Sequence, residues 1–177
     1  MTERITEVAV GATRTEGGTR TRSYRVGGAS ALPGMGDAGA RPLVALEICD
    51  DPALWPAVVL DEVGDLGGDL AGWAKAAEER WGADLVRLVL TSTRRRGFDD
   101  PASAGKAVGE VLAATGLPLI VEGSIDPALD TEVFRRCGEA GEGERLLLGT
   151  AEAERYRSVA AAALAYGHAV IAQTPID

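Results

Sequence analysis

Runs of hydrophobic and polar residues divide the chain into short predicted strands and longer predicted helices. Residues 5–13 alternate apolar with polar positions, and residues 22–26 form a matching run after the Gly17–Gly18 turn. Two such runs on either side of a turn predict an N-terminal β-hairpin. A Gly-rich stretch without any period follows up to residue 41. Residues 1–41 are therefore predicted to form a hairpin and an irregular lead-in.

A repeating unit of one buried strand and one amphipathic helix begins at residue 42. Five segments are nearly continuous apolar runs, as in strands covered on both faces. These predicted strands are residues 42–49, 84–90, 117–122, 146–148 and 169–172. Between them, four segments repeat apolar residues every three or four positions, which is typical of amphipathic helices.

The inward faces of these four helices, and the residues that bound them, can also be read from the pattern. The predicted inward residues are Leu70, Trp73, Ala74, Ala77 and Trp81; Ala104, Ala107, Val108, Val111 and Leu112; Val133, Phe134 and Cys137; and Tyr156, Val159, Ala160, Ala163 and Leu164. Asp69, Asp100 and Asp130 are the predicted N-caps, and Gly82, Gly116 and Gly167 the predicted stops.

Buried strands that alternate with helices predict a parallel α/β sheet. The spacing of the strands is close to the repeat of an eight-fold β/α barrel, which needs about 250 residues. A chain of 177 residues with five predicted strands is therefore expected to be the N-terminal part of a longer (β/α)8 TIM barrel, with residues 42–177 as one domain. Completion of the sheet by another chain and an open doubly wound sheet are the alternatives.

Composition and charge limit the partners and the location. Apolar residues make up 46% and charged residues 25%, as in ordinary globular domains, and no apolar run reaches the roughly 18 residues that span a bilayer. The net charge of −9 argues against nucleic acid or an anionic membrane as a partner. The polar opening does not resemble a signal peptide. Cys49 and Cys137 make no disulfide framework, so a reducing cytoplasm is the expected location.

The usual catalytic and metal-binding patterns are weak in this sequence. Residues 34–39 match the dinucleotide fingerprint by spelling but precede a strand instead of following one. His168, the only histidine, stands at the start of a predicted strand, where a structural hydrogen-bonding role is expected. Lys75 and Lys106 lie within predicted helices, which disfavours Schiff-base chemistry. Cys49 is expected to be a small core residue, and no metal ligand set follows from the spacing.

Polar residues gather instead after the predicted strands, where ligands meet a β/α barrel. Their hydroxyl, amide and carboxylate groups can hydrogen-bond the amide-rich edge of a large planar ligand, and are less suited to forming covalent intermediates. The residues expected to contact such a ligand are Thr91, Ser92, Thr93, Gly123, Ser124, Asp126, Gly149, Thr150, Gln173 and Thr174. Several of them are equally expected as helix caps and turn residues.

Short motifs from about residue 5 to residue 177 resemble one family when they are taken in order. They include residues 17–20 (GGTR), 55–56 (WP), 82–85 (GADL), 123–124 (GS), 147–151 (LLGTA), 165–168 (AYGH) and 172–177 (AQTPID). Together they resemble the small subunit of the corrinoid iron–sulfur protein, also called the delta subunit of the acetyl-CoA decarbonylase/synthase complex.

The resemblance implies an eight-fold β/α barrel in a heterodimer with a large subunit, which carries a corrinoid and a [4Fe–4S] cluster. The corrinoid is expected to lie over the C-terminal face of the barrel. The heterodimer would accept a methyl group from methyltetrahydrofolate or methyltetrahydromethanopterin, through a methyltransferase in the folate case, and deliver it to acetyl-CoA synthase. The implied pathway is the reductive acetyl-CoA pathway of carbon fixation, or methanogenesis from acetate in archaea. The chain would cover the cobalt macrocycle without catalysing, because the cofactor supplies the chemistry.

Two other functions follow from the same residues. Barrels related to this family bind methylated pterins through Asn and Asp at strand ends, so a pterin-dependent methyltransferase acting on a corrinoid protein is the alternative function. This chain has no Asn, and Thr91 and Ile125 occupy positions where polar pterin ligands are expected.

Arg94, Arg95 and Arg96 stand where the family has an acidic loop. They are expected to form either a solvated loop or a contact to corrinoid oxygens or an acidic partner. A half-barrel that self-associates through its sheet edges is the remaining possibility.

Overall fold

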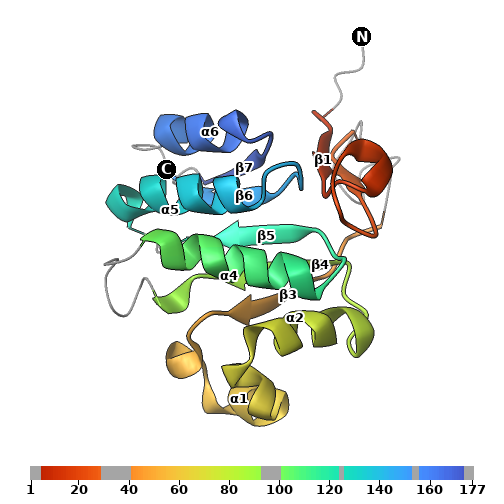
Figure 1. Cartoon of the computed structure of the whole chain (residues 1–177), viewed down its shortest axis with the longest axis vertical. Coiled ribbons are helices and arrows are strands. Elements are labelled where there is room, and N and C mark those ends of the chain that lie inside the picture. The colour runs from red at the N-terminus through yellow and green to blue at the C-terminus, as the bar shows by residue number, and fades with distance from the viewer. Residues whose placement is uncertain (1–4, 29–40, 93–100, 124–125, 153–155, 174–177) are drawn as a thin grey trace.

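The computed structural model describes residues 5–28, 41–92, 101–123, 126–152 and 156–173. It contains a two-stranded antiparallel hairpin and a separate five-stranded sheet (Figure 1). The hairpin pairs β1 (Val8–Val10) with β2 (Tyr24–Val26). The predicted N-terminal hairpin is therefore confirmed, although both strands are shorter than the alternating runs that predicted them.

The five strands of the main sheet are parallel and lie side by side in chain order. They are β3 (Ala45–Cys49), β4 (Leu85–Val89), β5 (Leu119–Glu122), β6 (Leu147–Ala151) and β7 (Ala169–Ala172). The predicted parallel α/β sheet is confirmed. Among these five strands the order has no reversal, and so it lacks the switch point that a doubly wound sheet has.

Four helices form a single layer against this sheet. They are α2 (Leu70–Glu79), α4 (Pro101–Ala114), α5 (Pro127–Ala140) and α6 (Tyr156–Ala165), and the short helix α1 (Ala57–Val63) contacts the 3-10 helix Gly64–Gly68 that precedes α2. Right-handed crossovers between strands in sequential order place the four layer helices on the same face. Figure 1 shows α2, α4, α5 and α6 side by side over the strands. The short helix α1 is not predicted by the sequence pattern, because seven residues give too little periodicity.

Aspartates begin two of the helices. Asp69 accepts a hydrogen bond from the Gly72 amide at 2.9 Å, as predicted for the start of α2. Asp126 accepts one from the Ala128 amide at 2.8 Å and caps α5. The predicted cap at Asp130 is therefore wrong, since this residue is buried in the first turn of α5. An aspartate followed by proline is the stronger start, because proline fits the first helical position.

The core lies between the helix layer and one face of the sheet. Alternate residues of neighbouring strands in register, Ile48, Leu88, Val121 and Leu148, are fully buried there. The helix side chains that meet them include Trp73, Val108, Val111, Phe134 and Cys137, all on predicted inward faces. The predicted core is thus confirmed for the central helices.

The last helix departs from its predicted face. Val159 and Ala163 are buried as expected, but Tyr156 is 46% exposed and Leu164 is 73% exposed. Helix α6 packs against α5 on one flank, and no helix among the described residues covers its other flank. The prediction that Tyr156 and Leu164 face inward is therefore wrong, because the apolar stripe of α6 is wider than the surface that covers it here.

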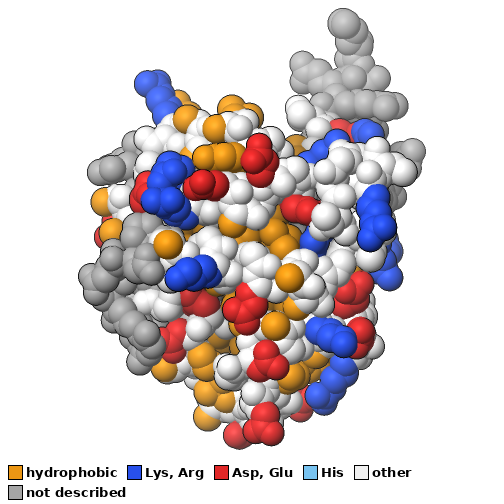
Figure 2. All heavy atoms as spheres, in the orientation of Figure 1, with side chains coloured by type: hydrophobic (Ala, Val, Ile, Leu, Met, Phe, Trp, Pro, Cys, Tyr) orange, Lys and Arg blue, Asp and Glu red, His pale blue; other side chains and the backbone are white. Residues whose placement is uncertain are grey.

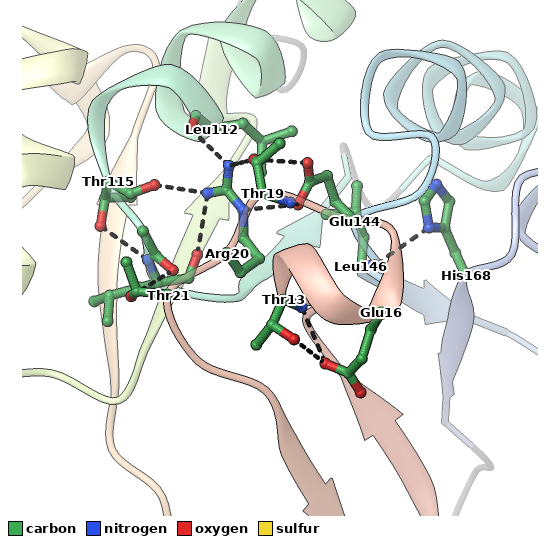
Figure 3. A network of polar contacts seen from close by, with 12 residues as sticks. Thr13, Glu16, Thr19, Arg20, Thr21, Leu112, Thr115, Glu144, Leu146 and His168 are labelled. Carbon is green, nitrogen blue, oxygen red and sulfur yellow. Dashed lines mark hydrogen bonds and ion pairs between the residues drawn. The ribbon is translucent and has the colours of Figure 1, made fainter.

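A buried arginine, Arg20, is central to the contacts between the N-terminal hairpin and the loops at the amino end of the sheet (Figure 3). The Arg20 guanidinium donates to the carbonyl oxygens of Leu112 at 2.8 Å and Thr115 at 2.6 Å, at the end of α4. Its Nε forms an ion pair with Glu144 at 2.8 Å. Arg20 and Glu144 are both buried, so this network excludes water from the end of the sheet that lies opposite to the predicted site.

His168 also serves the framework, as the sequence predicts. Its Nδ1 accepts a hydrogen bond from the Leu146 amide at 3.2 Å, and its Nε2 lies 2.9 Å from the Gly138 carbonyl oxygen, to which it donates. The bond that Nδ1 accepts requires the neutral ring, because the charged ring carries a proton on both nitrogens. Burial lowers the pKa of His168 below its usual value, outweighing the contact with Gly138.

The free energy of unfolding is expected to decrease as the pH is lowered through the range in which histidine ordinarily titrates. Because the pKa of His168 is lower in the folded chain, the unfolded chain binds the proton more readily. The free energy of unfolding should therefore hold above about pH 6.5 and decline as the pH falls below it. Urea unfolding between pH 8 and pH 5 checks this. His168→Gln should remove the slope, and an unchanged slope in this variant would assign it to other groups.

No described helix combines the length and the apolar character needed to cross a membrane.

Candidate functional site

The predicted ligand residues follow strands that end at a common edge of the sheet. Thr91, Ser92, Gly123, Asp126, Gly149, Thr150 and Gln173 are described, and they follow or end strands β4 to β7. Thr93, Ser124 and Thr174 lie outside the described residues, as do the Gly34–Gly39 fingerprint and the three arginines at 94–96. Since parallel neighbours end on the same side, the described members share the carboxyl edge of the sheet.

An aspartate that the sequence analysis did not select organises one end of this edge. Asp50, directly after β3, accepts hydrogen bonds from the Ser92 amide at 2.9 Å and from the Thr91 hydroxyl at 3.1 Å. The Ser92 hydroxyl also contacts the Asp50 carboxylate. Thr91 Oγ1 lies 2.7 Å from the Asp51 carbonyl oxygen and accepts a bond from the Asp51 amide at 3.1 Å. The ends of β3 and β4 are therefore joined by side chains.

These contacts change the interpretation of two predicted ligand residues. Thr91 is buried, and its hydroxyl is occupied by Asp50 and Asp51. Ser92 is half-buried and bound to the same carboxylate. Both hydroxyls connect the ends of β3 and β4. This is the structural role, as cap or turn residues, that the sequence analysis gave as the alternative to ligand binding. Asp50 could have been found from the sequence, because it immediately follows a predicted buried strand.

Removing the Asp50 carboxylate is expected to loosen this corner of the sheet. Asp50→Ala leaves the Ser92 amide and the Ser92 hydroxyl without their acceptor, at a cost of about 1–3 kcal/mol. Urea unfolding measures the change. Asp65→Ala, at an exposed carboxylate of the 3-10 helix Gly64–Gly68, is the matched control and should have no effect. Equal stabilities of the two variants would contradict the role given to Asp50.

Two glycines of the site are required by close packing. A Cβ atom at Gly123 would lie 2.3 Å from Asp130 Oδ1 and 2.9 Å from the Phe134 ring. One at Gly149 would lie 2.6 Å from the Ile171 Cβ atom. Side chains are excluded at both positions for structural reasons, whatever their backbone groups bind. By contrast, Asp126 and Gln173 are exposed and Thr150 is half-buried, so these three side chains can be reached from solvent.

The thiol groups of the chain are not activated. Both cysteines are buried and free. Burial raises the pKa of the Cys49 thiol to about 11, and it also raises that of Cys137. Since the thiolate is the nucleophile, Cys49 is a core residue at neutral pH, as predicted. Within the described part of the chain, no three His, Cys, Asp or Glu side chains are grouped so as to hold a metal ion.

Charged side chains also lie on the sheet face opposite to the helices. Arg87, in the middle of β4, forms ion pairs with Glu47 of β3 and Glu122 of β5. On the helix-covered side, Figure 2 shows acidic and basic side chains interspersed over the surface. The described chain thus combines polar strand ends with an ion-pair cluster on the open face of the sheet.

The fold and this edge define a parallel β/α protein with its helices on one sheet face and polar groups at its strand ends. The family model of the CO dehydrogenase/acetyl-CoA synthase delta subunit matches residues 7–177, and the chain belongs to this family. The resemblance stated from the motifs is thereby confirmed.

Curated relatives agree with the family match. The chain is 35% identical to the acetyl-CoA decarbonylase/synthase complex subunit delta of Methanopyrus kandleri, over 98% of the chain and 44% of that relative. It is 39% identical to subunit delta 1 of Methanosarcina thermophila, over 99% of the chain and 41% of the relative. For the Archaeoglobus fulgidus subunit delta, the identity is 35% over 98% of the chain and 40% of the relative. The chain therefore spans less than half the length of these relatives, which are named as subunits of a multi-subunit complex.

Proposed function

We propose that the chain is part of a corrinoid iron–sulfur protein subunit that covers the corrinoid while a methyl group passes from a methyltetrahydropterin to acetyl-CoA synthase. Family membership carries this proposal, since the relatives are named as delta subunits of the acetyl-CoA decarbonylase/synthase complex. The unactivated thiols, the framework role of His168 and the helical lysines support a non-catalytic task.

In this proposal the five β/α units, which occupy residues 42–177, form part of a longer (β/α)8 barrel. The single helix layer supports this, because in such a barrel all helices lie outside and the other sheet face becomes the interior. The sequential strand order supports it as well. The carboxyl edge of the sheet would then be the mouth of the barrel, where ligands of this fold bind.

The groups at this edge fit a corrinoid by their chemistry. The periphery of the macrocycle bears amide groups that both donate and accept hydrogen bonds. The Gln173 amide, the Thr150 hydroxyl and the Asp126 carboxylate are accessible partners, with backbone groups beside Gly123 and Gly149. The corrinoid, when bound, supplies the cobalt that carries the methyl group, and this edge would bind its periphery and exclude water.

The partner in this proposal is a large subunit that holds the corrinoid and a [4Fe–4S] cluster, in a heterodimer. Acetyl-CoA synthase and a methyltransferase would bind transiently. The two cysteines of this chain are buried core residues, so the cluster is assigned to the large subunit. Free thiols also fit a reducing cytoplasm.

Co-purification with a corrinoid-loaded large subunit tests this function. The pair should elute together, with the visible absorption of the corrinoid in the same fraction. Gln173→Ala combined with Thr150→Val should weaken the association, whereas Glu139→Ala on the outer surface of α5 should not. A chain that elutes alone and colourless beside the large subunit would refute the proposal. Heat released on titration of the chain alone with methyltetrahydrofolate would favour the pterin-dependent methyltransferase instead.

A further inference from the structure

A line of side chains crosses the open face of the main sheet. The strand register places Glu47 beside Arg87, Arg87 beside Ile120, Ile120 beside Leu147, and Leu147 beside Ala169. All five residues are partly exposed, whereas their neighbours along each strand that point the other way belong to the core. Glu47 and Arg87 are charged and the other three residues are apolar, which is unlike an ordinary solvent-facing surface.

The Arg87 guanidinium group joins the charged residue beside it in this line, Glu47, to Glu122 of β5. Arg87 forms ion pairs with both Glu47 and Glu122, and the exposed fractions of the three side chains are 38%, 39% and 19% respectively. Glu47 stands on β3, which is the first strand of the sheet and pairs only with β4 among the described strands. The ionic partner of Glu47 among the described residues is Arg87, which also pairs with Glu122.

We propose that the open face receives a further segment of the polypeptide, and that the strand placed along the free edge of β3 brings a lysine or arginine to Glu47. This rests on the barrel in the proposed function and deepens it by naming what the closing segment must carry. The relatives have more than half of their length outside the matched region, which is ample chain for this segment.

Charge complementarity leads to this occupant. A covering segment takes water away from Glu47, and a desolvated carboxylate needs ionic or hydrogen-bonding partners in place of water. Arg87 is already divided between two carboxylates. A basic side chain on the new neighbouring strand, directly opposite Glu47, would give this carboxylate a partner of its own.

A second copy of the chain fits the face less well. Each copy would bring the same Glu47 carboxylate on the same edge strand, and the chain as a whole carries a net charge of −9. Like charges placed opposite each other across strands are destabilising. An apolar partner would cover Ile120 and Leu147, but it would bury Glu47 without any added cation.

Amide hydrogen exchange tests the docking itself. The chain of 177 residues is compared with the same chain joined to the part of the Methanosarcina thermophila relative that lies outside the match. The edge-facing amides of β3 should exchange at least 100-fold more slowly in the joined chain, because a new strand accepts them. Unchanged exchange would overturn the proposal. A dimer of the unjoined chain that slows the same amides would overturn it in favour of a second copy.

Charge reversal then tests the predicted cation. Glu47→Lys in the joined chain should speed exchange of these β3 amides at least 10-fold, and Glu47→Gln should have a smaller effect. Glu62→Lys, at a carboxylate 74% exposed on α1, should leave exchange unchanged. Changing one lysine or arginine of the added segment to glutamate should restore protection to the Glu47→Lys chain. Protection that survives Glu47→Lys, or that no such change restores, would overturn the predicted cation. Neither corrinoid nor the large subunit is present, so the result is independent of cofactor binding.

Discussion

Replacing Arg20 by methionine is expected to lower the free energy of unfolding by about 3–5 kcal/mol, because it leaves the Glu144 carboxylate buried without its cation. The same change removes the donors to the Leu112 and Thr115 carbonyl oxygens, where α4 ends. Most domains are stable by only about 5–15 kcal/mol, so the variant should be close to unfolding. Urea denaturation at neutral pH measures the difference.

Two further variants separate the buried ion pair from a general loss of arginine. Arg25→Met removes an exposed ion pair with Glu7 on the same hairpin and should leave the unfolding midpoint unchanged. Arg20→Met combined with Glu144→Leu should recover part of the lost stability, because no buried charge is left unpaired. If Arg20→Met and Arg25→Met unfold at the same urea concentration, the hairpin is not held by this network.

Phe134→Ala is expected to cost about 3–5 kcal/mol, since it removes a fully buried ring from the layer between α5 and the sheet. This ring also lies against Gly123, where an added Cβ atom would approach it to 2.9 Å. The cavity would therefore open directly under the carboxyl edge of β5. Thermal and urea unfolding should both show the loss.

Tyr156→Ala on α6 provides the matched control for an aromatic side chain. Tyr156 is 46% exposed, so its removal creates no buried cavity and should change stability by less than about 0.5 kcal/mol. Equal losses of stability in the two variants would contradict the role of Phe134 as a core residue. They would also remove the packing argument for Gly123.

Hydrophobic patterning was sufficient to predict most of the elements in the main sheet. Four apolar runs correctly located β3, β4, β5 and β7 to within a few residues, because strands of a parallel sheet carry mostly apolar residues. The boundaries were less accurate. Strand β6 extends to Ala151, beyond its predicted end at Leu148, because Gly149 and Thr150 continue the pairing without a large apolar side chain.

Local chemistry also fixed the role of several single residues. His168 is a hydrogen-bonding residue of the framework and Cys49 is a buried thiol, as their positions beside predicted strands indicated. Asp69 caps α2 as predicted, while Asp130 does not cap α5, because the preceding Asp126 and Pro127 begin that helix one turn earlier. Caps depend on a few neighbouring residues, which is why the cap of α2 could be predicted from the sequence; the predicted cap at Asp100 lies outside the described residues.

The sequence by itself determined the alternation of strands and helices, the hairpin, the family and the edge at which the polar residues lie. Only the tertiary structure decided that Asp50 occupies the Thr91 and Ser92 hydroxyls, that Arg20 reaches Glu144 across 124 positions, and that Arg87 joins two carboxylates across three strands. Periodicity and caps act over a few residues and leave a trace in the order of amino acids. Pairing between distant side chains depends on register and crossover geometry, which no local pattern contains.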